Sequence, residues 1–261
     1  MSPTATNMRT ILDDVQLQHG PADLLGRVLL KSYTASLDRG VRIRFGSFDE
    51  LLATNESNSD SWKPLFPTFN PRYSQLSTSN AFCILGENER GEIVASQAAR
   101  LYSWNDTNLA AELESKRMLY TDPSMSPSER WLITAPKAAA IRGNIYFSGA
   151  SWYRPDFRGR QLIEIIPRFT RAYALGMWAP DLLVSFQDER IAAKGVIARS
   201  GFPNLQGTLQ MEGSPVGTIA LILAWMTPLE ILADLERFAL AAVTSDSRSV
   251  VGDRGAKNAA G

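Results

Sequence analysis

The stretch with the most chemical character is "YRPDFRGRQLI", residues 153–163, which joins an apolar run to a helix-like run through two arginines and a glycine. The first amide N–H groups of a helix have no intrahelical partner and lie at the positive end of the helix dipole, so they attract anions such as phosphate. Arg158 and Arg160 add positive charge there. The stretch therefore indicates a phosphate-binding turn. The alternative is a plain strand-to-helix corner whose arginines are solvated.

The composition limits which ligand such a turn can serve. Lys+Arg and Asp+Glu are equal at 27 each, so no overall positive field recruits nucleic acid or an anionic membrane. A single cysteine, Cys83, excludes an internal disulfide, and a single histidine, His19, leaves no Cys/His cluster for zinc. The N-terminus has no apolar run of signal-peptide length, and "TIALILAWM" is too short to span a bilayer. We expect a metal-free cytoplasmic protein with no nucleic-acid or membrane partner.

The chain is long enough for one sizeable core, with 261 residues of which 44% are hydrophobic. We expect an N-terminal segment over residues 1–20 and a single globular domain over 21–243. Residues 244–261 are rich in Gly, Ala, Ser and charge and lack periodicity, which predicts a disordered tail.

Hydrophobic periodicity predicts the elements that position the turn. Helices are expected over 23–37, 47–55, 106–119, 161–176, 189–200 and 227–240, and strands over 41–45, 144–153, 181–186, 208–213 and 217–226, with a hairpin over 81–102. Three prolines interrupt aromatic residues over 58–75, which predicts an ordered loop or flap. A hairpin combined with one parallel crossover indicates an α+β fold with a mixed sheet.

Helix ends carry their own signals. Asp106 or Thr107 is expected to cap the helix that follows, and Gly176 to close the helix that starts at the arginine turn. Thr227 and Glu230 have capping-box spacing around a proline at the first helical position.

This order of elements, with an R-G turn between a long strand and a helix, resembles the GCN5-related N-acetyltransferase (GNAT) superfamily. Its members show V-x-P-x-(Y/F)-R-G-x-G-x-(G/A) at the end of the fourth strand, and the matching residues here are Pro155, Phe157, Arg158 and Gly159. The resemblance covers roughly residues 41–240 in element order. It implies a three-layer α/β arrangement with a largely antiparallel sheet of about seven strands and flanking helices.

A second match lies in the later helix, which in many members reads N-x-x-A-x-x-L-Y-x-K-x-G-F. The segment "RIAAKGVIARSGF" keeps Ala193, the basic Arg199 and the terminal G-F. The tyrosine that often protonates the departing thiolate corresponds to Ile197, which has no proton to give, and the asparagine corresponds to Arg190. The catalytic residues therefore stay unassigned.

In this superfamily the turn wraps the pyrophosphate of coenzyme A and the preceding strand pairs with the pantetheine arm. The resemblance thus implies acetyl-CoA or another acyl-CoA as co-substrate. The expected binding residues are Trp152, Tyr153, Phe157, Arg158, Gly159, Arg160, Gln161, Leu162, Ile163 and Arg190. Gln161 and Ile163 replace two family glycines, so their Cβ atoms restrict how closely the backbone approaches phosphate.

The resemblance implies an N-acyltransferase, in its simplest form an acetyltransferase, that acts on an amine of a small molecule or peptide. An amide near Tyr153 is expected to stabilise the oxyanion, and the 58–75 flap to influence the choice of acceptor. The alternative is a catalytically silent module that binds acyl-CoA or another ligand, which Ile197, Ile163 and Gln161 favour. A transferase that uses aminoacyl-tRNA is disfavoured by the neutral charge balance. The sequence leaves open the acyl group, the acceptor and the oligomeric state, including a homodimer.

Overall fold

The computed structural model describes residues 9–192, 199–214 and 217–241. Their strands form one sheet of eight, in the order β1-β2-β3-β5-β6-β8-β7-β4. The strands are β1 (Arg42–Gly46), β2 (Ala81–Glu87), β3 (Ile93–Trp104), β4 (Arg130–Ile133), β5 (Gly143–Tyr153), β6 (Leu182–Asp188), β7 (Asn204–Ser214) and β8 (Gly217–Met226).

All neighbouring strands in this sheet run antiparallel except β5 and β6, which are parallel. The helices are α1 (Ala22–Leu37), α2 (Phe48–Ser57), α3 (Leu109–Glu114), α4 (Lys137–Ala140), α5 (Leu162–Trp178), α6 (Glu189–Ala192) and α8 (Pro228–Leu240). α5 is the crossover between the two parallel strands. The predicted α+β class with a mixed, largely antiparallel sheet is therefore confirmed, and the strand beyond the expected number of about seven is β4.

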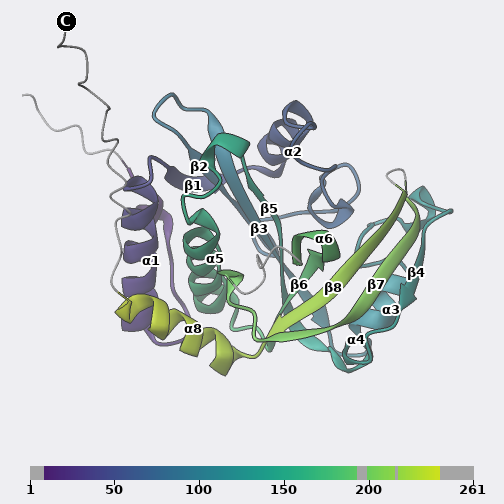
Figure 1. Cartoon of the computed structure of the whole chain (residues 1–261). Helices are drawn as coiled ribbons and strands as arrows, with labels where there is room; N and C mark the ends of the chain where they lie inside the picture. Colours follow the sequence, from purple (N-terminus) through teal and green to yellow (C-terminus); the bar gives the residue numbers. More distant parts are fainter. Residues whose placement is uncertain (1–8, 193–198, 215–216, 242–261) are drawn as a thin grey trace, which may run out of the picture.

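Helices cover both faces of the sheet, which gives the predicted three layers. α1, α5 and α8 lie together on one face (Figure 1), and their buried residues form one hydrophobic cluster with that face. α2, α3 and α4 contribute to a second cluster on the other face. α1, α5 and α8 each have an apolar stripe, and burying that stripe against the sheet stabilises the fold.

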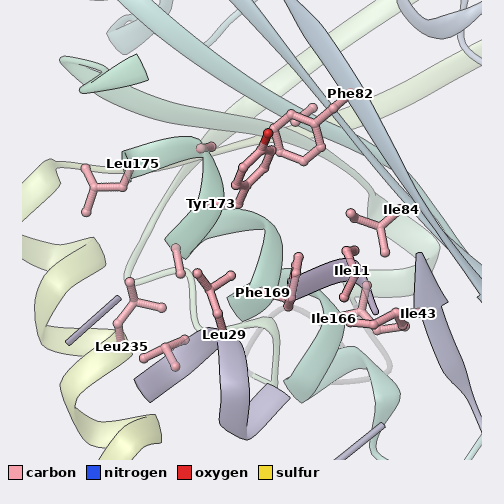
Figure 2. Close-up of a cluster of buried hydrophobic side chains, with 14 of the residues drawn as sticks. Ile11, Leu29, Ile43, Phe82, Ile84, Ile166, Phe169, Tyr173, Leu175 and Leu235 are labelled. Carbon is pink, nitrogen blue, oxygen red and sulfur yellow. The ribbon is translucent and has the colours of Figure 1, made fainter. Parts of the chain in front are cut away.

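Figure 2 shows the first cluster at the level of α5. Ile166 and Phe169 of α5 are fully buried and pack with Leu29 of α1, Leu235 of α8 and Ile84 of β2. The helix that begins at the arginine turn is thus anchored along its length by neighbours on three elements. This anchoring fixes the position of its first turn.

The ends of α5 and α3 differ most from their predictions, and α3 stops at Glu114, short of the predicted residue 119. α5 does not close at Gly176 but continues to Trp178, and Ala179 takes the left-handed conformation instead, with φ 44. Gly176 lies inside the helix because Leu17 packs against it: a Cβ at this position would come within 2.3 Å of the Leu17 Cδ2 atom. The glycine therefore permits a close contact and does not terminate the helix.

The start of α3 is also corrected. Its N-cap is Asn108, whose side chain accepts from the Ala111 amide at 3.1 Å, and not Asp106 or Thr107. The capping box of Thr227 and Glu230 at α8 is confirmed.

The strand β4 was not expected. Its four residues pair with β7 at the edge of the sheet and alternate between exposed and half-buried, with none fully buried. The predicted tail over 244–261 lies outside the described residues.

Candidate functional site

β5 and β6 pair over only part of their lengths. Their parallel register joins Ile145–Ser148 with Leu182–Ser185. Beyond that register, β5 continues over 149–153 and pairs with β3, while β6 continues over 186–188 and pairs with β8. The two strands therefore separate, and within the described part of the chain one edge of β5 faces no strand. We call this gap the opening, and its last paired register the apex.

A β-bulge lies next to the apex. Ala150 has a left-handed φ of 50, and the register of β3 with β5 shifts between Ser96 and Ala98. The Ser96 hydroxyl donates a 2.7 Å hydrogen bond to the Ala150 carbonyl, which holds the bulge. Left-handed backbone at a non-glycine residue stores strain, and such strain clusters at functional sites.

The turn that follows β5 presents free backbone donors. Gly159 and Gln161 both have left-handed φ, of 82 and 59, and Gln161 is the residue before α5. The amide groups of residues 159–163 make no hydrogen bond to any described residue. The start of α5 thus has the unpartnered N–H groups and the positive dipole end that bind anions.

Arg158 connects this turn to the opening. Its Nε donates to the Tyr153 carbonyl at 3.1 Å and its Nη2 to the Ser61 carbonyl at 3.3 Å. The side chain is exposed, and an arginine has five N–H donors. Donors that these two contacts do not use remain available to a phosphate oxygen.

Arg160, the second arginine of the turn, is held by Phe157 and by the backbone of Arg39. Its guanidinium lies 4.0 Å from the centre of the Phe157 ring and donates to the Arg39 carbonyl at 3.1 Å. Phe157 itself is buried, so it serves as a fixed platform for the arginine.

Arg39 is a site residue that the sequence reasoning missed. Its Nη2 donates to the Gln161 Oε1 at 2.7 Å, and its Nη1 to the Ala35 carbonyl at 2.9 Å. This contact fixes the side chain of Gln161. No local motif marks Arg39, because it follows α1 and lies 122 residues earlier in the chain.

A short segment of the flap crosses the opening. Trp62 stacks on Trp152 of β5 with ring centres 4.8 Å apart, and the Trp152 Nε1 donates to the Ser61 Oγ at 3.2 Å. Lys63 Nζ lies 2.8 Å from the Oδ2 of Asp188 at the end of β6. We call residues 61–63 the strap, because they contact both strands beyond the apex.

Asp188 forms ion pairs with two side chains, Lys63 and Arg190. Arg190 donates to it at 2.9 Å in addition to Lys63, and these hydrogen bonds, the Arg190 bond foremost, hold the pKa of Asp188 well below its usual range. The carboxylate is therefore ionised at neutral pH. Arg190, expected at the cofactor, contacts Asp188 across the opening from the arginine turn.

The predicted binding residues divide into two groups. Arg158, Arg160 and Gln161 meet at the start of α5, as described above. Trp152 and Leu162 are buried in contacts with the protein, and burial raises the pKa of Tyr153. Ile163 is half-buried. Ala193 and Ile197 lie outside the described residues, so the expected position of the missing acid stays a prediction.

Within residues 9–192, 199–214 and 217–241, no group of three or more His, Cys, Asp or Glu side chains is placed to hold a metal ion. None of the helices in the same ranges combines the length and apolar character needed to cross a membrane.

Comparison with known proteins gives similarity in structure alone. No protein-family model matches the sequence, and no curated protein matches it. Similar solved structures include the aminoglycoside acetyltransferase AAC(6')-Ib in complex with coenzyme A and kanamycin, at 11% identity and TM-score 0.41, over 73% of this chain and 96% of that one. Spermidine/spermine N-acetyltransferase SpeG from Vibrio cholerae, in mutant form, is similar at 7% identity and TM-score 0.45, over 74% and 97%. The spermidine N-acetyltransferase from the same organism, with CoA and spermine, gives 9% and 0.43, over 74% and 98%.

Proposed function

We propose that the chain is a divergent member of the GNAT superfamily that binds an acyl-CoA and transfers its acyl group to an amine. The observation that carries this proposal is the separation of β5 from β6 beside a helix start with free amides. An unpaired strand edge and an anion-binding turn then follow one another along the chain, from β5 into the start of α5. A linear ligand with a phosphate at one end and hydrogen-bonding amides along its length matches both.

The charged groups at the turn suit a pyrophosphate. The amides of residues 159–163 would hold its oxygens, and Arg158 and Arg160 would add charge-assisted hydrogen bonds. The pantetheine arm would then lie along β5 over 149–153, where its amides replace the missing strand.

The replaced glycines are compatible with this ligand. Gln161 already has the left-handed backbone that glycine adopts most readily, and Arg39 draws its side chain to one side. Gly159 is retained, and a Cβ there would meet nothing within 4 Å, so the space in front of it is open. The residues present therefore fit a pyrophosphate.

The chemistry would be direct attack of a neutral amine on the thioester. Holding the two reactants together supplies much of the rate in such a reaction, so a weakly defined acid and base do not prevent it. We propose a small-molecule or peptide amine as the acceptor, an acetyl group as the simplest acyl group, and one catalytic domain over residues 21–243.

Thermal unfolding with CoA and acetyl-CoA tests the binding step. Either ligand is expected to raise the Tm, because a ligand that binds only the native state stabilises it by mass action. No shift at millimolar concentrations would reject the proposal.

Thiol release with Ellman's reagent tests the transfer step, with spermidine, kanamycin and Nα-acetyl-lysine as acceptors. Release that depends on an acceptor supports a transferase. Binding without release from any acceptor favours the second candidate, a silent acyl-CoA-binding module, which the substitutions at Gln161 and Ile163 suggest.

A further inference from the structure

Two buried serines lie at the apex of the opening. Ser148 of β5 and Ser185 of β6 are direct partners in the last parallel register before the strands separate. Paired residues of neighbouring strands extend to the same face of a sheet, so the two side chains lie next to each other. Ser148 is 7% exposed and Ser185 is 4% exposed.

Each hydroxyl is oriented by a glutamine amide. Gln97 Nε2 donates to the Ser148 Oγ at 2.8 Å, and Gln187 Nε2 donates to the Ser185 Oγ, also at 2.8 Å. A serine hydroxyl has one proton to donate as well as lone pairs to accept. These glutamine bonds use each hydroxyl as an acceptor, which leaves each hydroxyl its own proton to donate to a ligand.

The same cluster holds two polar atoms that lack partners. The Gln97 Oε1 and the Tyr146 hydroxyl are buried and make no hydrogen bond to any described group. Buried polar atoms without partners are costly and usually mark a place where a ligand or a water molecule completes the set.

We propose that Ser148 and Ser185 donate hydrogen bonds to the thioester carbonyl oxygen of the bound acyl-CoA. This inference rests on the proposed function and names catalytic residues for it. The apex is where the unpaired stretch of β5 ends, so a ligand that lies along this stretch with its phosphates at the turn would place its acyl end at this register. Two donors side by side suit a carbonyl oxygen that becomes an oxyanion.

The acyl transfer conserves atoms and electrons as follows. The amine lone pair forms the N–C bond while the carbonyl π pair moves onto oxygen, where the two hydroxyls stabilise the charge. When that pair returns, the C–S bond breaks and the sulfur leaves with the bonding pair. The proton lost by the amine ends on the sulfur, which gives an amide and free CoA. The serines donate hydrogen bonds and keep their protons, so no acidic side chain is needed for this role.

The test compares acetyl-CoA with S-ethyl-CoA, a thioether that has a methylene in place of the carbonyl. Their dissociation constants are measured by calorimetry for the wild type and for Ser148→Ala and Ser185→Ala. Each substitution is expected to weaken acetyl-CoA about three- to tenfold, which is the range of one neutral hydrogen bond. The dissociation constant of S-ethyl-CoA should change by less than about twofold, because this ligand has no carbonyl oxygen that could accept a hydrogen bond from either serine.

The infrared band of acetyl-CoA labelled with ¹³C at the carbonyl gives a second readout. Bound to the wild type, the band should lie at lower frequency than in either variant, since hydrogen bonds weaken the C=O bond. Ser32→Ala is the matched control: Ser32 is a fully buried serine in α1 whose hydroxyl has no partner in the described ranges. Ser32→Ala should change neither the ratio of the dissociation constants of acetyl-CoA and S-ethyl-CoA nor the frequency of the carbonyl band.

The outcomes separate this inference from the proposed function. If the ratio of the dissociation constants of acetyl-CoA and S-ethyl-CoA is the same in the wild type and in both alanine variants, the serine assignment is wrong and the acyl-CoA site stands. If neither ligand binds the wild type, the proposed function itself fails. Where an alanine variant does not fold, Ser148→Thr and Ser185→Thr keep the hydroxyl and should retain the wild-type ratio, while loss of the ratio in a folded threonine variant would count against the assignment.

Discussion

Arg171 of α5 and Asp234 of α8 form a buried ion pair, with Nη1 and Oδ2 2.7 Å apart and each side chain 2% exposed. Asp234 also accepts from Arg168 at 2.8 Å, and the Arg171 Nη2 donates to the Ser200 carbonyl at 2.5 Å. The pair therefore links the helix that starts at the anion-binding turn to α8 and to the segment before β7. Burial lowers the pKa of Arg171, and the charge of the Asp234 carboxylate opposes that lowering.

Asp234→Ala is expected to lower the free energy of unfolding by about 3–5 kcal/mol, because it leaves Arg171 buried without a counter-charge. Urea denaturation measures the change. Arg237→Ala is the control, since Arg237 is 72% exposed and lies 4.0 Å from the same carboxylate; it should cost less than about 1 kcal/mol. A double variant, Arg171→Met with Asp234→Leu, should be less destabilised than Asp234→Ala. Equal losses in the two would show that the charge pairing is unimportant.

Arg158→Ala and Arg160→Ala should each weaken CoA binding by about 1–3 kcal/mol, because each removes a charge-assisted hydrogen bond to phosphate. Calorimetry with CoA measures the loss. Arg27→Ala, at an exposed position of α1, should bind CoA as the wild type does. Unchanged affinity in both turn variants would mean that these arginines serve only their contacts within the protein and do not bind phosphate.

The strap should control access to the opening. Trp62→Ala removes the stack on Trp152 and is expected to speed the association of acetyl-CoA in stopped-flow measurements, at a cost in stability of about 1 kcal/mol. Arg72→Ala breaks an exposed ion pair with Glu56 elsewhere on the flap and should leave the association rate unchanged. Slower association in Trp62→Ala would argue that the strap forms part of the binding surface.

The ion pairs of Asp188 should persist in acid. Because hydrogen bonds lower the pKa of the folded carboxyl, its contribution is fully present above the unfolded value of about 3.9 and is lost as the pH falls through the lower folded value. The difference in unfolding free energy between wild type and Asp188→Asn should therefore be constant from about pH 8 to pH 5 and shrink below about pH 4. A difference that already shrinks at neutral pH would contradict the pairing.

Cys83 should not react in the native protein. It is fully buried in β2, and burial raises the pKa of its thiol to about 12, so almost no thiolate is present at pH 8. Ellman's reagent should detect one thiol in urea and essentially none in buffer. Rapid labelling of the native protein would contradict this burial and would add a background to the thiol-release assay.

Local patterns predicted much of this architecture. Periodicity placed the strands that flank the turn and the crossover helix, and capping-box spacing located the start of α8, because these signals arise from neighbours in the sequence. The end of α5 was not predicted, because the role of Gly176 depends on a residue far away in the chain: the glycine leaves room for the side chain of Leu17. β4 was missed because an edge strand with one partner needs little apolar patterning.

The candidate site divides in the same way. The residues of the turn carry a motif, so they were predicted together. Arg39, the strap and the two serines were not, since each acquires its role from a partner on another element: Gln161 for Arg39, Trp152 and Asp188 for the strap, and a neighbouring strand for the serines.

The strap also bears on self-association. A strand edge with unpaired backbone groups is a template on which another polypeptide can add, and this is a common route to aggregation. Here Trp62 and Lys63 cross that edge from β5 to β6, so a second strand with its side chains would have to displace both contacts. A thin chain without side chains needs less room, so the strap would slow its entry without excluding it. The fold thus leaves the unpaired edge of β5 accessible to a slender ligand, while the strap hinders a strand of another protein molecule from pairing with that edge.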